Sequence, residues 1–289
     1  MKKLTGLMLI AFLSVMTLSA QLNEKKLNFR IATYNIRLET PADSGACAWE
    51  KRKLDVARII KAYSFDIFGV QELGSSKQEA DLKALIPEFS YVGKGRDSED
   101  GTKGEQIGVF YRTNRFLAKE KGSFFLSQTP DVMSKGWDAD FRRMCVWTKL
   151  YDKNLHKEFF VFCSHFDHIG KIARIESAKL IINRIKTIAG KYPVLFVGDL
   201  NSSPQDSAMY QALTDYMIDS VVSATKKTIP TDGTFNGYDM KTVNFPSKQK
   251  IDYIFYRRMK VLDYRVLNDR FNDFSYPSDH FPVMCEVSF

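Results

Sequence analysis

The sequence predicts an α/β protein in which mixed β-sheets pack on each other and helices cover the outside. Three observations predict this class. Apolar runs typical of buried strands alternate with amphipathic helices in the first third of the chain. A succession of strand-like runs then follows without a helix between them. Another long amphipathic helix, another apolar run and a final group of strands close the chain.

The individual elements follow from the period of the apolar residues and from the positions of Ser, Gly and Pro. We expect strands at 29–36, 65–72, 106–112, 116–126, 144–152, 158–166, 192–200, 250–257, 260–267 and 282–289. We expect helices at 49–63, 75–86, 173–189 and 207–214. The succession of strands between 106 and 166 predicts antiparallel pairing of neighbours. Polar loops are expected at 93–106, 127–140 and 225–250, where substrate contacts usually lie.

Residues 1–20 have the composition of a secretory signal peptide rather than of a domain. Two lysines precede a largely apolar stretch, 7–18, and Ala20 ends a small-residue exit. The apolar part is short for a membrane span, although an uncleaved anchor is the alternative. We therefore expect cleavage after Ala20 and export to the periplasm or the medium. The remainder, 21–289, contains no linker-like Pro/Gly/Ser run and is expected to form a single domain.

The charge and the cysteines narrow the class of protein. The 289-residue chain has a formal net charge of +8, and two lysines of this excess lie within residues 1–20. This modest, dispersed charge suits an anionic substrate but lacks the dense Lys/Arg blocks of a nucleic-acid coat protein. Cys145, Cys163 and Cys285 lie in strand-like apolar runs and Cys47 in a loop, so we expect free thiols. The sequence has no Cys/His spacing typical of zinc.

Polar side chains gather where the expected strands begin or end. They are Asn35, Glu72, His165, Asp167, His168, Asp199, Asn201, Asp252, Asp279 and His280. Three of the four histidines lie in these segments, which random placement would not produce. In the segment GDLN, alternation along a strand would point Asp199 and Asn201 the same way. A helix cap is the alternative for these two residues.

The chemical types fit hydrolysis of a phosphate ester. Asn35, Glu72 and Asp279 are hard oxygen donors of the kind Mg²⁺ binds, and a bound metal stabilises charge on phosphate oxygens. Protonated His165 and His280 can bond the remaining phosphate oxygens.

The other acidic and amide groups complete this set. Asp199 and Asn201 can hold and deprotonate an attacking water, and Asp252 can fix an imidazole in one tautomer. The sequence has no GxSxG segment and no P-loop.

Six short segments in this order resemble the endonuclease/exonuclease/phosphatase superfamily, which includes deoxyribonuclease I, exonuclease III and inositol-polyphosphate 5-phosphatases. They are TYNIR (33–37), GVQE (69–72), SHFDH (164–168), GDLNSSP (198–204), IDYIF (251–255) and SDHFP (278–282). Two further segments, WEKRK (49–53) and RRMCVW (142–147), resemble a secreted bacterial branch near the deadenylase-like group.

This resemblance implies a fold and a site. The fold is the deoxyribonuclease I-like four-layer α/β sandwich, with two mixed sheets face to face and helices outside. Asn35 and Glu72 match the family's metal ligands, and Asp279 a residue at or near the metal. Mg²⁺ is the expected ion, with Mn²⁺ as its substitute.

The same resemblance assigns the remaining roles. Asp199 matches the residue that activates water and Asn201 the neighbour that fixes water and phosphate; Asp252 matches the partner of His280, and His165 the first phosphate-contacting histidine. Arg143 and His168 are expected at the substrate phosphate. Arg142 competes with Arg143 for this role, and the alternative for either is a position on an edge strand. For Asp167 and His168 the alternative is that one of them only contacts His165 or a loop amide.

We therefore expect an exported, Mg²⁺-dependent phosphoesterase that acts by in-line water attack, as a monomer without an obligate protein partner. The substrate stays open between a phosphodiester, in nucleic acid or a phospholipid headgroup, and a phosphomonoester such as a sugar phosphate, with a slight preference for a diester. A lipid substrate would use an apolar lip containing Met133 and Trp137. Export argues against messenger-RNA deadenylation. The alternative to an enzyme is a non-catalytic binding module on the same fold.

Overall fold

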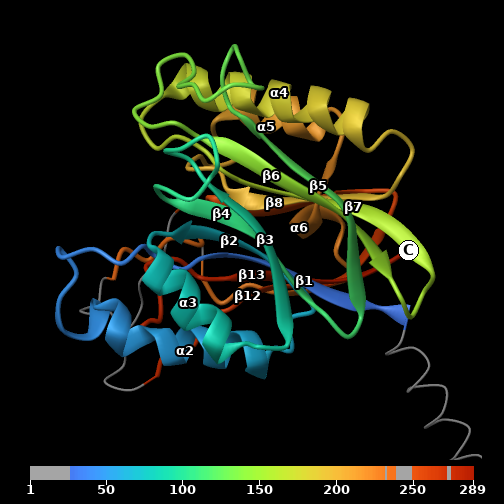
Figure 1. Ribbon diagram of the computed structural model, residues 1–289. Coiled ribbons are helices and arrows are strands. Elements are labelled where there is room, and N and C mark those ends of the chain that lie inside the picture. Colours follow the sequence, from blue (N-terminus) through green and yellow to red (C-terminus); the bar gives the residue numbers. More distant parts are fainter. Residues whose placement is uncertain (1–26, 232, 239–248, 272–274) are drawn as a thin grey trace, which may run out of the picture.

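The computed structural model describes residues 27–231, 233–238, 249–271 and 275–289. Two mixed β-sheets lie face to face, and helices cover the two outer faces (Figure 1). The predicted four-layer sandwich is therefore confirmed. The expected signal peptide, 1–20, lies outside the described residues, as does part of the expected loop 225–250. In the part of the chain that is described, no helix combines the length and apolar character needed to cross a membrane.

The first sheet has seven strands in the order β10-β12-β13-β1-β2-β4-β3. Its central strands β1 and β2 are parallel, which brings Asn35 opposite Gln71 at their carboxyl ends. The strands are β1 Phe29–Asn35, β2 Ile67–Leu73, β3 Phe89–Gly95, β4 Gln106–Arg112, β10 Lys226–Thr228, β12 Lys260–Val266 and β13 Val283–Ser288.

The second sheet has six strands in the order β5-β6-β7-β8-β11-β9. Parallel pairing of β7 with β8 places His165 opposite Asp199, and antiparallel pairing of β8 with β11 places Asp252 opposite the same Asp199. The register thus lines up three predicted site residues across neighbouring strands. The strands are β5 Phe116–Phe125, β6 Met144–Asp152, β7 Lys157–His165, β8 Val194–Asp199, β9 Ile218–Asp219 and β11 Asp252–Arg257.

Two pairs of helices form the outer layers. The helices α2 (Trp49–Ala62) and α3 (Ser76–Leu85) pack on the first sheet, and α4 (Lys171–Ile188) and α5 (Ser207–Thr214) pack on the second (Figure 1). The predicted serine cap is present, because Ser75 accepts a hydrogen bond from the Gln78 amide. Two further short segments, η1 (Gly45–Cys47) and α6 (Ser220–Ser223), are helical within the described residues.

The main core lies between the sheets, where apolar side chains of both inner faces interdigitate. Ile31 and Val109 contribute from the first sheet and Val161 and Val197 from the second, and all four are fully buried. At Gly69 of β2 the sheets approach so closely that a Cβ would lie 2.4 Å from the Val197 side chain. This close approach holds the site-bearing end of β2 against β8.

Several details differ from the sequence predictions. Strand β3 was not expected, because its glycines and lysine read as the start of a loop. The expected antiparallel succession holds from β5 to β7, but β4 and β5 lie in different sheets, so the chain crosses the sandwich between them. Part of the loop 225–250 is strand β10. All four cysteines are free, and the three expected in strands are buried.

Candidate active site

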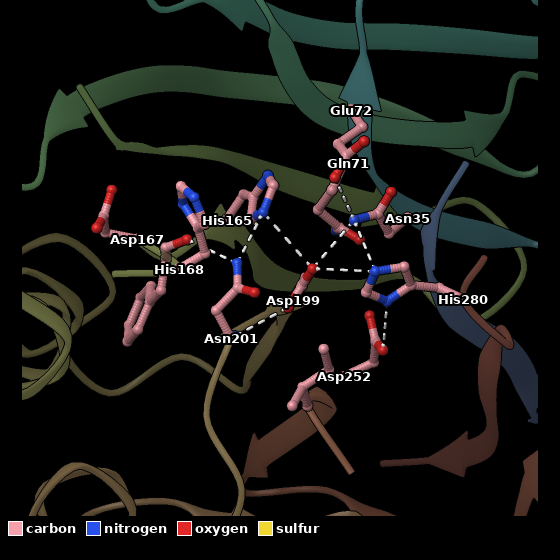
Figure 2. A network of polar contacts seen from close by, with 12 residues as sticks. Asn35, Gln71, Glu72, His165, Asp167, His168, Asp199, Asn201, Asp252 and His280 are labelled. Carbon is pink, nitrogen blue, oxygen red and sulfur yellow. Dashed lines mark hydrogen bonds and ion pairs between the residues drawn. The ribbon is translucent and has the colours of Figure 1, made fainter. Parts of the chain in front are cut away.

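The carboxylate of Asp199 lies at the centre of a buried polar network between the two sheets (Figure 2). Its Oδ2 atom is 3.0 Å from Asn35 Nδ2, 3.5 Å from His165 Nε2 and 3.6 Å from His280 Nε2. The side chain is 1% exposed. One carboxylate therefore meets an amide and two imidazoles, which come from three different strand ends.

The GDLN segment forms a turn rather than a continued strand. Strand β8 ends at Asp199, and Asn201 adopts a left-handed conformation with φ 47°. The Asn201 amide donates to Asp199 Oδ1 at 2.9 Å in an Asx turn, and the next helix begins only at Ser207, so the helix-cap alternative is wrong. The Asn201 side chain lies 3.0 Å from His165 Nε2. A turn, not strand alternation, brings Asp199 and Asn201 to the same place.

His280 and Asp252 form a buried pair behind Asp199. His280 Nδ1 lies 3.0 Å from Asp252 Oδ2, which is the contact that the resemblance predicts. Burial lowers the pKa of His280, but the carboxylates of Asp252 and Asp199 outweigh it, so the pKa lies well above its ordinary value. The two carboxylates, 3.0 Å and 3.6 Å from the ring nitrogens, favour the positively charged imidazolium.

His165 has a carboxylate partner that the sequence did not reveal, Glu105. Its Oε1 atom lies 2.8 Å from His165 Nδ1, and its Oε2 atom lies 3.0 Å from Arg96 Nη1. Burial raises the pKa of Glu105, but His165, Arg143 and Arg96 outweigh it and lower the pKa to about 2. Glu105 stands alone in a polar loop before β4 and belongs to no recognisable motif, so only the three-dimensional structure identifies it.

Glu72 reaches the network through strained backbone. The pairing of β2 with β4 is irregular between Val70 and Leu73, and Glu72 has φ 59°. This conformation brings Glu72 Oε1 to 3.0 Å from Asn35 Nδ2, and Oε2 accepts from the Leu38 amide at 3.1 Å. A non-glycine residue in this region costs roughly 1 kcal/mol, which is the kind of strain that functional sites retain.

Asp279 stands beside this carboxylate. Burial raises the pKa of Asp279, and the negative charge of Glu72 raises it further, although His280 opposes both effects. Arg37 Nη1 lies 3.6 Å from Asp279 Oδ2. The charge of Glu72 thus disfavours the ionised form of Asp279, and carboxylate oxygens suit a hard divalent cation. That Glu72 and Asp279 hold a metal stays a prediction.

Two other features of the polar network around Asp199 bear on metal binding. The ligand atoms of Asp199, Asp252 and His280 lie within 4.8 Å of one another, so this buried group also has metal-like spacing. There the imidazolium already supplies positive charge between the carboxylates. The third predicted ligand, Asn35, directs its nitrogen at Glu72 and Asp199, while its oxygen accepts from the Arg37 amide at 3.0 Å. Its ligand role stays a prediction.

Arg143 and His168 lie in a second group that Glu105 joins to the centre. Arg143 Nη1 is 3.6 Å from Glu105 Oε1, and Arg143 Nη2 is 3.4 Å from His168 Nδ1. Asp167 turns away from the centre (Figure 2) and accepts hydrogen bonds from the backbone amides of Phe141, Ile169 and Gly170. For Asp167 the loop-amide alternative is thus correct.

The buried guanidinium of Arg52 fixes the backbone beside the site. It donates to the carbonyls of Cys47, Ile36, Arg37, Leu38 and Pro277, and the side chain is 2% exposed. Three of these carbonyls directly follow Asn35, and that of Pro277 precedes the segment of Asp279 and His280. Arg52, in the WEKRK segment, therefore joins the segment that follows Asn35 to the segment that contains Asp279 and His280.

Comparison with known proteins now identifies the family. The sequence model of the endonuclease/exonuclease/phosphatase family matches residues 32–280. The chain belongs to this family. Members of the family hydrolyse phosphate esters, and the chain is an enzyme of this kind. Enzymes of the family typically depend on divalent metal ions.

Solved structures of family members have the same fold. A family protein from Bacteroides thetaiotaomicron is 37% identical, with a TM-score of 0.85 over 91% of this chain and 98% of that one. A mannosyl-6-phosphatase of the same organism is 36% identical, with a TM-score of 0.85 over 90% and 100%. The catalytic domain of human Nocturnin, at 19% identity and a TM-score of 0.68 over 91% and 93%, shares the fold.

The Glu105–His165 pair gives a first prediction. Glu105→Gln removes the buried anion that contacts His165 and Arg96, and we expect a loss of about 3 kcal/mol in the free energy of unfolding at pH 7. Because the pKa of Glu105 is lowered on folding, its contribution is complete above pH about 4.5 and is lost as the pH falls towards 2. Urea unfolding of both proteins across this range measures the difference. A difference that grows towards low pH would contradict the assignment.

The Arg52 contacts give a second prediction. Arg52→Lys keeps the charge but cannot serve five carbonyls, so we expect a loss of about 2 kcal/mol in unfolding free energy. In the protein that remains folded, we expect kcat to fall at least tenfold while KM changes little. Steady-state kinetics below the unfolding transition measures both constants. Wild-type kcat in the folded variant would show that Arg52 has a role in stability alone.

Proposed function

We propose that the chain is a divalent-metal-dependent phosphatase that releases phosphate from a terminal phosphomonoester. The observation that carries this proposal is the burial of the reactive groups: Asp199, His165 and His280 are only 1%, 4% and 5% exposed. A phosphate at the end of a small molecule reaches such a depth more readily than one inside a polymer. The similarity over the full chain to a mannosyl-6-phosphatase supports a sugar phosphate as the substrate.

In the proposed reaction, each side chain of the network has a part. Asp199 accepts a proton from the attacking water, which Asn201 orients, and the leaving group departs on the opposite side of phosphorus. The imidazolium of His280, held by Asp252, and the imidazole of His165, held by Glu105, bond the phosphate oxygens. Asn35 fixes the carboxylates of Asp199 and Glu72 relative to each other. A Mg²⁺ ion at Glu72 and Asp279, with Mn²⁺ as its substitute, would supply further stabilisation of phosphate charge.

The proposal keeps two further expectations from the sequence and changes the expected substrate from a diester to a monoester. We keep export and a monomeric state as parts of it, and fractionation of cells that produce the full chain tests export. The expected diesterase is no longer preferred, because no feature of the described site favours it over a phosphomonoesterase. A lipid headgroup is not favoured either, since Met133 packs against the core and Trp137 is half-buried.

Phosphate release from a substrate panel tests the activity. With Mg²⁺ we expect turnover of mannose 6-phosphate, glucose 6-phosphate and p-nitrophenyl phosphate, and none with a chelator. Asp199→Asn and His280→Ala should each lower kcat by a factor of at least about 1,000, because they remove the proton acceptor and the imidazolium. Lys121→Gln, on an exposed part of β5, is the matched control.

Three results would overturn parts of this proposal. Faster hydrolysis of bis(p-nitrophenyl) phosphate or single-stranded DNA than of any monoester would restore the diesterase. Full activity in chelator would exclude the metal-dependent reaction. Equal phosphate release by the wild type and both variants would leave the binding module as the better reading.

A further inference from the structure

A wall of side chains beside His165 has no part in the mechanism above. Arg96 Cζ lies 4.8 Å from the ring centroid of Phe141, and the His168 ring stacks on Phe141 at 5.7 Å with an interplanar angle of 19°. Arg143 lies behind them, with Cζ 5.8 Å from the same centroid. We call these four residues the Phe141 wall. Glu105 contacts both arginines of the wall and His165, so the wall adjoins the phosphate position.

The wall carries donors that lack acceptors. Arg143 is 6% exposed, yet its Nε and Nη1 atoms find no hydrogen-bond partner in the described residues. Arg96 Nη1 is buried and forms an ion pair with Glu105 whose angles are not those of a hydrogen bond. Since Arg143 donates to His168 Nδ1, the ring proton of a neutral His168 lies on the other nitrogen, and His168 is exposed. The Arg143 atoms face carboxylates only at 3.6 Å, and buried N–H groups without an acceptor at hydrogen-bond distance point to a ligand that supplies one.

The carboxylates beside the wall already accept hydrogen bonds, and the charges of the wall are balanced. The Asp167 carboxylate is used by three backbone amides, and Glu105 is used by His165 and the arginines. Two guanidinium groups therefore face two carboxylates, and the neighbouring Arg142–Asp97 pair is balanced as well. A second phosphate would need a surplus of positive charge. A neutral group rich in oxygen acceptors matches this wall better.

We propose that the Phe141 wall binds the leaving group of the substrate and that this group is a hydroxyl-rich ring, as in a hexose phosphate. This inference rests on the proposed phosphatase function. Hydroxyl and ring oxygens accept from Arg96, Arg143 and His168. The exposed part of Phe141, which is 44% exposed, contacts the C–H groups of the ring. Arg96 and His168 are then specificity-determining residues.

The kinetic test compares substrates that share a phosphate but differ in the leaving group. For Arg96→Gln and His168→Gln we expect kcat/KM for mannose 6-phosphate to fall about tenfold, equivalent to about 1.4 kcal/mol. The value for p-nitrophenyl phosphate, whose leaving group has no sugar hydroxyls, should change less than about twofold. Arg142→Gln, next to the wall and paired with Asp97, is the control and should change neither.

A binding test is independent of turnover. In the Asp199→Asn protein, mannose 6-phosphate should bind more tightly than inorganic phosphate in calorimetry, and adding Arg96→Gln should remove that advantage. Equal affinities before that change would overturn the wall even if the enzyme is active. Equal losses on both kinetic substrates would mean that Arg96 only supports Glu105. If the protein preferred a hexose bisphosphate and Arg96→Gln removed this preference, the wall would bind a second phosphate and not the sugar ring.

Discussion

The buried carboxylate of Asp199 is the constraint on which the rest of the site depends. An anion removed from water must be surrounded by donors and positive charge. Asn35, Asn201 and two imidazoles provide these contacts, and each imidazole in turn needs a carboxylate on its far side, Asp252 or Glu105. Glu105 then requires the guanidinium groups of Arg96 and Arg143. Each polar group around Asp199 thus needs a partner of its own, and the network extends outward from one carboxylate.

The pairing of the strands positions most of the side chains that surround Asp199. His165, Asp199 and Asp252 occupy matched positions on three adjacent strands of one sheet, and Asn35 arrives at the end of a parallel pair in the other. The close approach at Gly69 keeps these ends together. The geometry of the site is therefore largely a property of strand register, which the packed core maintains.

The sequence could predict the groups that lie at strand ends but not those that act from loops. Asn35, Asp199, Asp252 and His280 stand in recognisable segments next to apolar runs, so their meeting follows from sheet topology. Glu105 and Arg96 lie in a polar loop whose composition suits any exposed turn, and their contacts depend on how that loop folds back. Strand β3 was missed for the related reason that cross-strand pairing overrides the preference of its glycines for turns.

The four unpaired cysteines have a consequence for how the protein is made. Burial raises the pKa of the Cys163 and Cys285 thiols to about 12 and that of Cys145 well above its ordinary value, so hardly any thiolate forms near neutrality. The native state contains no disulfide among these four cysteines, so a reductant has no bond to break. Folding therefore needs no oxidant, and a reducing cytosol is compatible with it.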